Sequence, residues 1–135
     1  MPSTGLVAIQ SVRFPSAFLR IDGSKVTQPQ GAGSGTVNGQ YYSSGNYPTV
    51  GNDYELLVIG GVIIPNLPLV YYIQSGPFPN AFLRIDGSNV NQPQGAGSGT
   101  VNCQYYDVSN QQTPGSPQDY ELFHIVPLTS FAGPW

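Results

Sequence analysis

The chain has 135 residues, of which only 8% are charged, and its formal net charge is −3, whereas an ordinary globular domain carries about 25% charged residues. Four basic residues are too few to hold nucleic acid through phosphate contacts, so we expect no nucleic-acid partner. One cysteine and one histidine exclude an internal disulfide framework and a multi-cysteine zinc site, and we expect neither a metal nor a cofactor.

The N-terminal segment shows no secretion signal. Residues 1–6 contain no basic residue, and no long apolar run follows them, whereas a secretory signal peptide has both features. We therefore expect a cytoplasmic protein, with an unconventional export route left open.

The first half of the chain predicts short strands separated by turns. Its glycines and prolines interrupt the chain too often for long helices, and its apolar residues alternate as they do in strands. In chain order, the expected strands are Leu6–Val12, Ala17–Asp22, Thr36–Tyr42 and Tyr54–Ile59, with a short extra strand at Val62–Ile64.

The segment Leu56–Ile73 is uncharged over 18 residues, which is long enough to be considered as a membrane span. Gly60, Gly61, Pro65 and Pro68 interrupt it, and it is rich in β-branched residues. These features predict a strand, a turn-rich connector and a second strand, so we expect no membrane span.

The second half of the chain repeats the first. Residues 73–106 align without gaps with residues 9–42, and 28 of the 34 positions are identical. The tetrapeptide Asp-Tyr-Glu-Leu at residues 53–56 recurs at residues 119–122, beyond a loop that differs in length and content. We predict a single all-β domain, residues 1–135, with a first repeat at 6–60 and a second repeat at 69–126. The strands expected in the second repeat are Leu69–Gln74, Ala81–Asp86, Thr100–Tyr106 and Tyr120–Val126.

An identical glycine-rich loop lies between the second and third strands of each repeat, at residues 28–35 and 92–99. A phosphate-binding loop of this composition would lead into a helix. The segment that follows alternates like a strand, so we expect no phosphate site. The identity of the two loops reflects either a recent duplication or a role in shaping a site, and the divergence of residues 43–52 and 107–118 favours the second explanation.

Eight of the eleven charged residues stand in repeated pairs. Arg20 and Asp22 lie two apart on one strand and therefore share a face of the sheet. Such a pair is either a structural ion pair or, with nearby amides and a phenol, a set of donors and acceptors for a neutral polyhydroxylated ligand. An aromatic ring would cover the apolar C–H surface of that ligand. The candidate ligand-binding residues are Arg20, Asp22, Asn38, Gln40 and Tyr42 in the first repeat and Arg84, Asp86, Asn102, Gln104 and Tyr106 in the second.

The single cysteine and the single histidine occupy positions that the first repeat fills with other residues. Cys103 replaces Gly39, and His124 replaces Val58. The repeat therefore requires neither a thiol nor an imidazole, and we expect Cys103 to be a small buried hydrophobic residue.

Two carboxylate pairs, Asp53/Glu55 and Asp119/Glu121, have the minimal composition of a glycosidase site. Both belong to a tetrapeptide that we expect to open a largely apolar strand, which indicates a structural role. No nucleophile and base are singled out elsewhere, so we expect no enzyme.

The same order of short motifs runs through both repeats. The first repeat reads Val7-Ala8-Ile9-Gln10, Phe18-Leu19-Arg20-Ile21-Asp22-Gly23, Gly35-Thr36-Val37-Asn38 and Tyr54-Glu55-Leu56-Leu57, and the second ends with Tyr120-Glu121-Leu122-Phe123-His124-Ile125. Each repeat thereby resembles one four-stranded lobe of a β-trefoil of the fascin-like and ricin-B-like lectin kind. The resemblance implies a β-trefoil-like barrel in a family whose members crosslink actin or bind sugars, and we carry over no binding residue from it. Other closures stay open: a two-fold pseudo-symmetric eight-stranded barrel or sandwich, a trefoil with a cryptic third lobe, or lobes shared between chains.

The leading functional hypothesis is a non-enzymatic, lectin-like protein that binds carbohydrate with one polar site per repeat, so that two sites give avidity. The first alternative is a structural or assembly protein that crosslinks a filament or associates with itself as a homo-oligomer. The low charge and the many glycines and tyrosines fit that alternative. The second alternative is a protease inhibitor that presents the proline-containing loops Tyr47–Asn52 and Thr113–Gln118.

Overall fold

The computed structural model describes residues 5–29, 32–43, 45–49, 53–93 and 95–126, and all regular elements in these ranges are β-strands except one 3₁₀ turn. Neighbouring strands pair antiparallel in one seven-stranded sheet, in the order β1-β4-β5-β6-β7-β3-β2. The prediction of an all-β protein is confirmed. The elements are β1 (Leu6–Val7), β2 (Ala17–Asp22), β3 (Gly35–Tyr41), β4 (Leu57–Val62), β5 (Val70–Ser75), β6 (Ala81–Asp86), β7 (Thr100–Tyr105) and the 3₁₀ turn η1 (Val108–Asn110).

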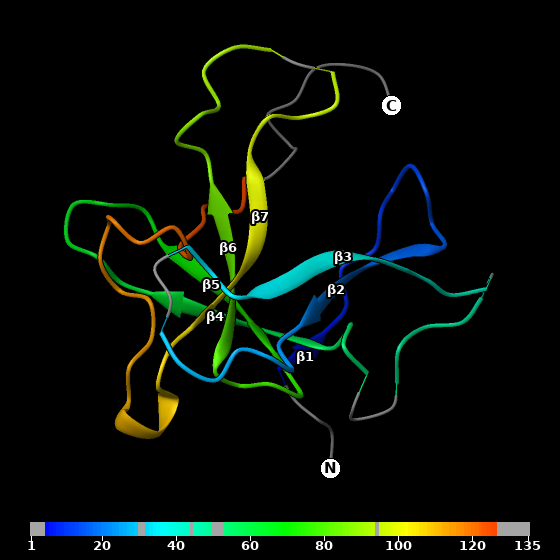
Figure 1. Cartoon of the computed structure of the whole chain (residues 1–135), viewed down its shortest axis with the longest axis horizontal. Helices are drawn as coiled ribbons and strands as arrows, with labels where there is room; N and C mark the ends of the chain where they lie inside the picture. Colours follow the sequence, from blue (N-terminus) through cyan, green and yellow to red (C-terminus); the bar gives the residue numbers. More distant parts are fainter. Residues whose placement is uncertain (1–4, 30–31, 44, 50–52, 94, 127–135) are drawn as a thin grey trace.

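Three hairpins form the body of the molecule. In Figure 1, β2–β3 extends to the right, β6–β7 upward and β4–β5 to the left, and the three meet near the centre. The hairpins β2–β3 and β6–β7 have the same register, since Arg20 faces Asn38 across the first and Arg84 faces Asn102 across the second. Identical local sequence therefore gives identical local pairing.

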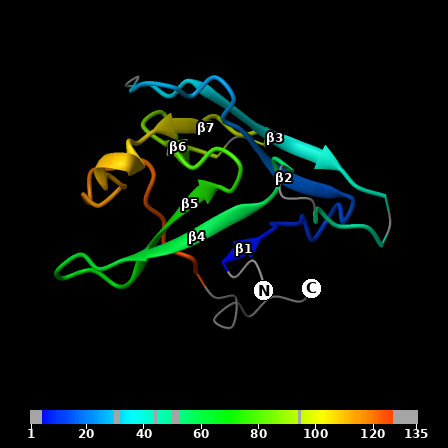
Figure 2. The same ribbon diagram turned by 90° about the horizontal axis from the view of Figure 1, so that it is seen from below.

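The uncharged segment 56–73 forms β4, a connector and most of β5, as predicted, except that Gly60 and Gly61 lie within β4 and do not interrupt it. Figure 2 shows this hairpin projecting from the rest of the sheet. The ranges that the structure describes contain no helix long and apolar enough to cross a membrane.

The first strand is shorter than predicted because the chain changes partners. Residues 6–7 pair with β4, but the next residues hydrogen-bond to β2, where the Leu19 amide donates to the Ile9 carbonyl (2.8 Å) and the Ser11 amide to the Ala17 carbonyl (2.9 Å). The counterpart contact in the second repeat joins Gln74 of β5 to Phe82 of β6.

The fourth strand of each repeat was predicted to begin too early. Residues 53–56 form a turn, in which the Leu56 amide donates to the Asp53 carbonyl (3.2 Å), and β4 begins only at Leu57 and runs on through Val62, with no separate strand at 62–64. In the second repeat, the segment 120–126 makes only a single bridge, from Phe123 to Tyr71. A segment needs a neighbour that continues alongside it to form a ladder, and β4 has two such neighbours, β1 and β5.

Both repeats contribute to one hydrophobic core. Its buried members come from β2, β4, β5, β6, β7 and the turn after β2, where the hairpins meet. They are Ile21, Val26, Leu57, Ile73, Ala81, Leu83 and Cys103.

The two repeats approach each other so closely at Gly23 and Gly35 that no side chain larger than hydrogen fits there. A Cβ added to Gly23 would lie 2.7 Å from the Cβ atoms of both Ala81 and Phe78, and a Cβ on Gly35 would overlap the sulfur of Cys103. Because β3 pairs with β7 at Gly35 and Cys103, the turn of the first repeat lies directly against the second repeat.

We expect Gly23→Ala to lower the free energy of unfolding by about 1–3 kcal/mol, because the added methyl group would force apart a close-packed contact. The matched control is Gly87→Ala at the equivalent position of the second repeat, where a Cβ meets nothing within 4 Å and the change should stay within about 0.5 kcal/mol. Urea denaturation measures both variants. Equal effects would contradict the asymmetry of the two turns.

Candidate functional site

A charged network surrounds Arg20 in the first repeat. Its Nη2 lies 3.7 Å from Asp22 Oδ2, its Nε lies 3.9 Å from Glu55 Oε2, and its Nη1 donates to Asn38 Oδ1 at 3.4 Å. Residues 20 and 22 meet because they share a strand face, and residue 38 meets them because β3 pairs with β2. The turn at residues 53–56 brings the glutamate to the same place.

The same network recurs around Arg84 in the second repeat. Arg84 Nη2 lies 3.4 Å from Asp86 Oδ2 and Nε lies 3.9 Å from Glu121 Oε2, while Nη1 donates to Asn102 Oδ1 at 3.3 Å. The Arg84 side chain is only 6% exposed, whereas that of Arg20 is 23% exposed. The second network is therefore more deeply buried.

Asp22 and Asp86 cap the turns that follow β2 and β6. Asp22 Oδ1 accepts hydrogen bonds from the Ser24 amide (3.0 Å) and hydroxyl (2.6 Å), and Asp86 accepts the same pair from Ser88. These hydrogen bonds, assisted by the nearby arginines, hold the pKa of both carboxyls below the usual range. Both aspartates are thus ionised turn caps that also face an arginine.

Each buried glutamate accepts a hydrogen bond from a tyrosine. Tyr42 Oη donates to Glu55 Oε1 and Tyr106 Oη donates to Glu121 Oε1, both at 2.8 Å. Burial, followed by the neighbouring glutamate, raises the pKa of both tyrosines well above their usual value, so each phenol keeps its proton. Burial also raises the pKa of Glu121.

An aromatic ring lies against each arginine. The guanidinium carbon of Arg20 is 4.7 Å from the ring centroid of Tyr54, and that of Arg84 is 4.9 Å from the centroid of Tyr120. A cation over a ring face is attracted by the ring quadrupole. One face of each ring is therefore taken by protein.

A cavity of about 250 Å³ opens over the second network. Of the ligand-binding residues predicted in the second repeat, Arg84, Gln104 and Tyr106 line this cavity, whereas Asp86 and Asn102 do not. The Asn102 side chain instead donates to the Ala32 carbonyl of the first repeat at 2.9 Å. The cavity is lined by Arg84, Gln104, Tyr106, Gln118, Asp119, Tyr120 and Glu121.

In the first repeat, the predicted residues make the same contacts within their repeat as their counterparts in the second. Arg20, Asp22 and Asn38 contact one another, and Tyr42 joins them through Glu55. Gln40 is exposed, and its Oε1 accepts the amide of Tyr41 at 3.0 Å. The first-repeat counterpart of Gln118 is residue 52, which lies outside the described residues.

Sequence reasoning missed four lining residues of the cavity, because it assigned residues 120–126 to an apolar strand. These residues begin with a turn instead, and a turn gathers its polar side chains on one side of the chain. The sequence feature that could have indicated these residues is the tetrapeptide Asp-Tyr-Glu-Leu, which is identical in both repeats although the loops before it differ. The missed residues are Gln118, Asp119, Tyr120 and Glu121.

Protein donors already occupy both carboxylates of the cavity. Asp119 Oδ2 accepts the amides of Gly115 and Ser116, each at 2.9 Å. Glu121 is held by Tyr106 and Arg84. In this arrangement the carboxylates order the turn and neutralise the arginine.

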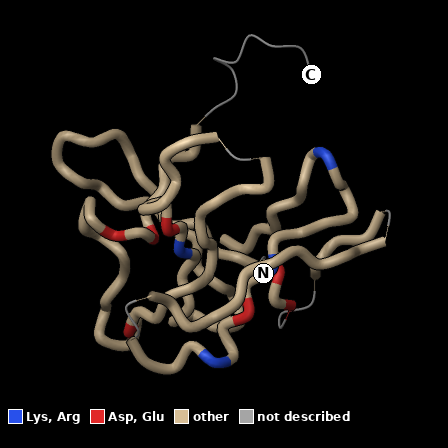
Figure 3. Tube along the Cα trace, turned by 45° about the horizontal axis from the view of Figure 1, so that its top comes forward, with Lys and Arg blue, Asp and Glu red and all other residues tan. Residues whose placement is uncertain are grey.

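The remaining residue types provide no further site. Cys103 is fully buried, with its sulfur 3.7 Å from the Asp22 carbonyl oxygen, and burial raises the pKa of its thiol to about 11. Among the described residues, no group of three or more His, Cys, Asp or Glu side chains could hold a metal ion. Figure 3 shows how sparse the charges are along the trace.

Each of the two proline-containing loops buries one proline in its described part. Tyr47 contacts the Phe18 ring with centroids 5.8 Å apart, and Pro48 and Pro114 are buried. Residues 50–52 of the first loop lie outside the described residues. The other described residues of the two loops, Pro117 among them, are exposed, so the protease-inhibitor alternative stays a prediction.

Comparison with known proteins adds no relative: no family model matches the chain, and neither does any curated protein or solved structure.

We expect Tyr106→Phe to lower the free energy of unfolding by about 1–3 kcal/mol, because it leaves the buried Glu121 carboxylate with one donor fewer. In the wild-type protein, the hydrogen bond from Tyr106 lowers the pKa of Glu121, although burial keeps that pKa raised overall. Tyr106→Phe removes this bond, so the folded-state pKa of Glu121 rises further above its unfolded value. The destabilisation is then smallest at acidic pH and grows as pH rises through the folded pKa of Glu121.

Urea denaturation across the acid and neutral range measures this effect. The control is Tyr41→Phe, at an exposed tyrosine, which should change stability by less than about 0.5 kcal/mol. A destabilisation by Tyr106→Phe that is constant with pH would contradict the assignment.

We also expect the Cys103 thiol to react with a disulfide reagent at least about tenfold more slowly in the folded than in the unfolded protein, because the thiolate is the reactive form and burial suppresses it. Absorbance at mildly alkaline pH, with and without denaturant, measures the two rates. Equal rates would show that the thiol is accessible.

Proposed function

We propose that this protein is a non-enzymatic, lectin-like module that binds carbohydrate, and that the polar cavity of the second repeat holds one sugar ring. The observation that carries the proposal is the cavity of about 250 Å³ lined by Gln104, Gln118, Tyr120 and the buried charged network. Pockets for drug-sized ligands span about 300–1,000 Å³, so a smaller, polar ligand suits this one.

The role of each lining residue follows from the contacts that it makes within the protein. Arg84 and Glu121 face each other and their own partners, so they form a charged floor. Gln104 Oε1 already accepts the amide of Tyr105 at 3.0 Å, so Gln118, whose side-chain amide combines donors and an acceptor, is the amide that suits vicinal hydroxyl groups. Tyr120 is exposed, and its ring face opposite Arg84 can cover the C–H surface of a sugar.

We propose further that each repeat is a β-trefoil-like lobe with its own site. In support, β6–β7 has the register of β2–β3. The bridge between Phe123 and Tyr71 is equivalent to the pair of Leu57 with Val7. Two sites of one kind would give avidity for a ligand with repeated sugar units.

Titration of the protein with mono- and oligosaccharides, followed by calorimetry, tests the proposal. We expect Gln104→Ala and Gln118→Ala each to weaken binding by about tenfold, the effect of one or two lost hydrogen bonds. Gln28→Ala, at an exposed glutamine outside the cavity, is the matched control.

Binding that persists unchanged in both cavity variants would place the sugar elsewhere. No binding of any glycan at about 1 mM protein and ligand, where even weak complexes form, would remove the proposal altogether.

A further inference from the structure

The two repeats contact each other through two different surfaces, one from each repeat. The first repeat contributes one end of β2–β3, where Ile21 is 0% and Val26 is 5% exposed. We call this set of residues the donor end: Ile21, Gly23, Val26, Gly35 and Val37. The second repeat contributes a receiving surface, which we call the acceptor side: Phe78, Ala81, Asn102 and Cys103.

The second repeat has its own donor end, and that end is uncovered. Ile85 is 45%, Val90 53% and Val101 46% exposed, although these residues are identical to the buried set in the first repeat. A Cβ on Gly87 would meet nothing within 4 Å, whereas one on Gly23 would overlap the second repeat. The apolar residues and glycines of the two ends are the same, and the first end is covered by the second repeat whereas the second end has no such cover among the described residues.

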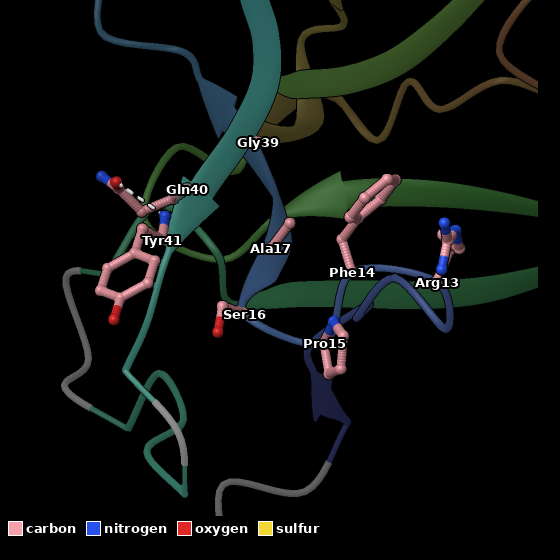
Figure 4. Close-up of a pocket in the computed structure, with 8 residues that line it drawn as sticks. All are labelled: Arg13, Phe14, Pro15, Ser16, Ala17, Gly39, Gln40 and Tyr41. Carbon is pink, nitrogen blue, oxygen red and sulfur yellow. Dashed lines mark hydrogen bonds between the residues drawn. The ribbon is translucent and has the colours of Figure 1, made fainter.

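The first repeat likewise has an uncovered acceptor side. In the second repeat, Phe78 contacts the ring of Tyr54 at 5.0 Å between centroids, whereas the counterparts of this pair, Phe14 and Tyr120, are both exposed. A cavity of about 490 Å³ lies at Phe14, Ala17 and Gly39. Figure 4 shows it between the loop that precedes β2 and the end of β3.

We propose that the chain associates with itself head to tail, the donor end of the second repeat docking on the acceptor side of the first repeat of a second molecule. The internal contact sets the register. Gly35 and Thr36 pair with Cys103 and Asn102 inside the molecule. Gly99 and Thr100 of one molecule therefore face Gly39 and Asn38 of the next.

The chemistry of the two surfaces matches this occupant. The donor end is aliphatic and uncharged, and the cavity at Ala17 and Gly39 offers an apolar recess of the kind that such side chains fill. Gly39, in the place of Cys103, leaves more room than the internal contact has. The surfaces are different patches on one molecule, so the contact is heterologous and gives a ring or an open filament.

The contact is confined to the hairpins, because the loop beside them differs at Val12 and Arg13, where the second repeat has Gly76 and Pro77. Gly76 donates its amide to the Leu56 carbonyl at 2.8 Å, and a Cβ there would lie 2.9 Å from that oxygen. The first repeat has Val12 at the equivalent place. Its side chain keeps the next molecule from approaching as closely there.

The first experiment measures mass against concentration by sedimentation and light scattering, up to about 1 mM. We expect the mean mass of the wild-type protein to rise with concentration. Gly87→Ala and Ile85→Lys should weaken association by about tenfold or more. Ile63→Lys, at an exposed isoleucine of the β4–β5 connector, should leave association unchanged.

The second experiment mixes variants that have lost opposite halves of the contact. Gly39→Arg blocks the acceptor side, and the fold tolerates it because the nearest atom to a Cβ there is 3.8 Å away. Ile85→Lys blocks the donor end. Each variant alone should be monomeric, and the mixture should form a dimer, since each retains the half that the other lacks.

A wild-type protein that stays monomeric at all concentrations would overturn the proposal. So would association that Gly87→Ala and Gly39→Arg leave intact, or variants that fail to complement each other. Circular dichroism verifies folding, and if Ile85→Lys does not fold, Gly87→Ala replaces it in the mixture. Tyr120 lines the sugar cavity and is also the counterpart of Tyr54 in this contact, so the variants separate the two proposals. Gln104→Ala and Gln118→Ala test sugar binding, and Gly87→Ala and Gly39→Arg test association.

Discussion

The architecture depends on the close approach of a glycine turn in the first repeat to the side of the second. Gly23 and Gly35 carry no side chain, so their backbone can lie against Ala81, Phe78 and Cys103. This approach closes one core to which both repeats contribute buried residues. It also makes the molecule asymmetric, since one glycine turn is covered and its twin is open.

A second constraint is the burial of charge in a protein that has little of it. Arg20 and Arg84 each lie among an aspartate, a glutamate and a tyrosine ring, and a buried guanidinium without such partners would be strongly destabilising. The hydroxyl of a different tyrosine, Tyr42 or Tyr106, donates a hydrogen bond to the glutamate. The charged residues of the candidate site therefore hold the turn in place through contacts within the protein.

Sequence reasoning succeeded where a single local pattern determines structure. Residues 17–22 and 81–86 alternate and end at Asp-Gly, and both form the predicted strands. It failed at residues 53–56 and 119–122, where apolar Tyr and Leu suggested a strand. The carbonyl and amide groups there close a turn, and the turn carries the glutamates into the arginine networks. Three of the seven lining residues of the cavity, Asp119, Tyr120 and Glu121, were missed for that reason.

The amino-acid sequence by itself determined the all-β class, the repeated hairpins and the meeting of Arg, Asp and Asn on one sheet face, since these follow from alternation and from pairing within each repeat. The tertiary structure alone decided which copy of each identical residue is buried. Ile21 and Ile85 have the same neighbours in sequence, yet the first lies in the core and the second faces outward. Burial depends on what packs against a residue from elsewhere in the chain, and only one of these two isoleucines has such a neighbour.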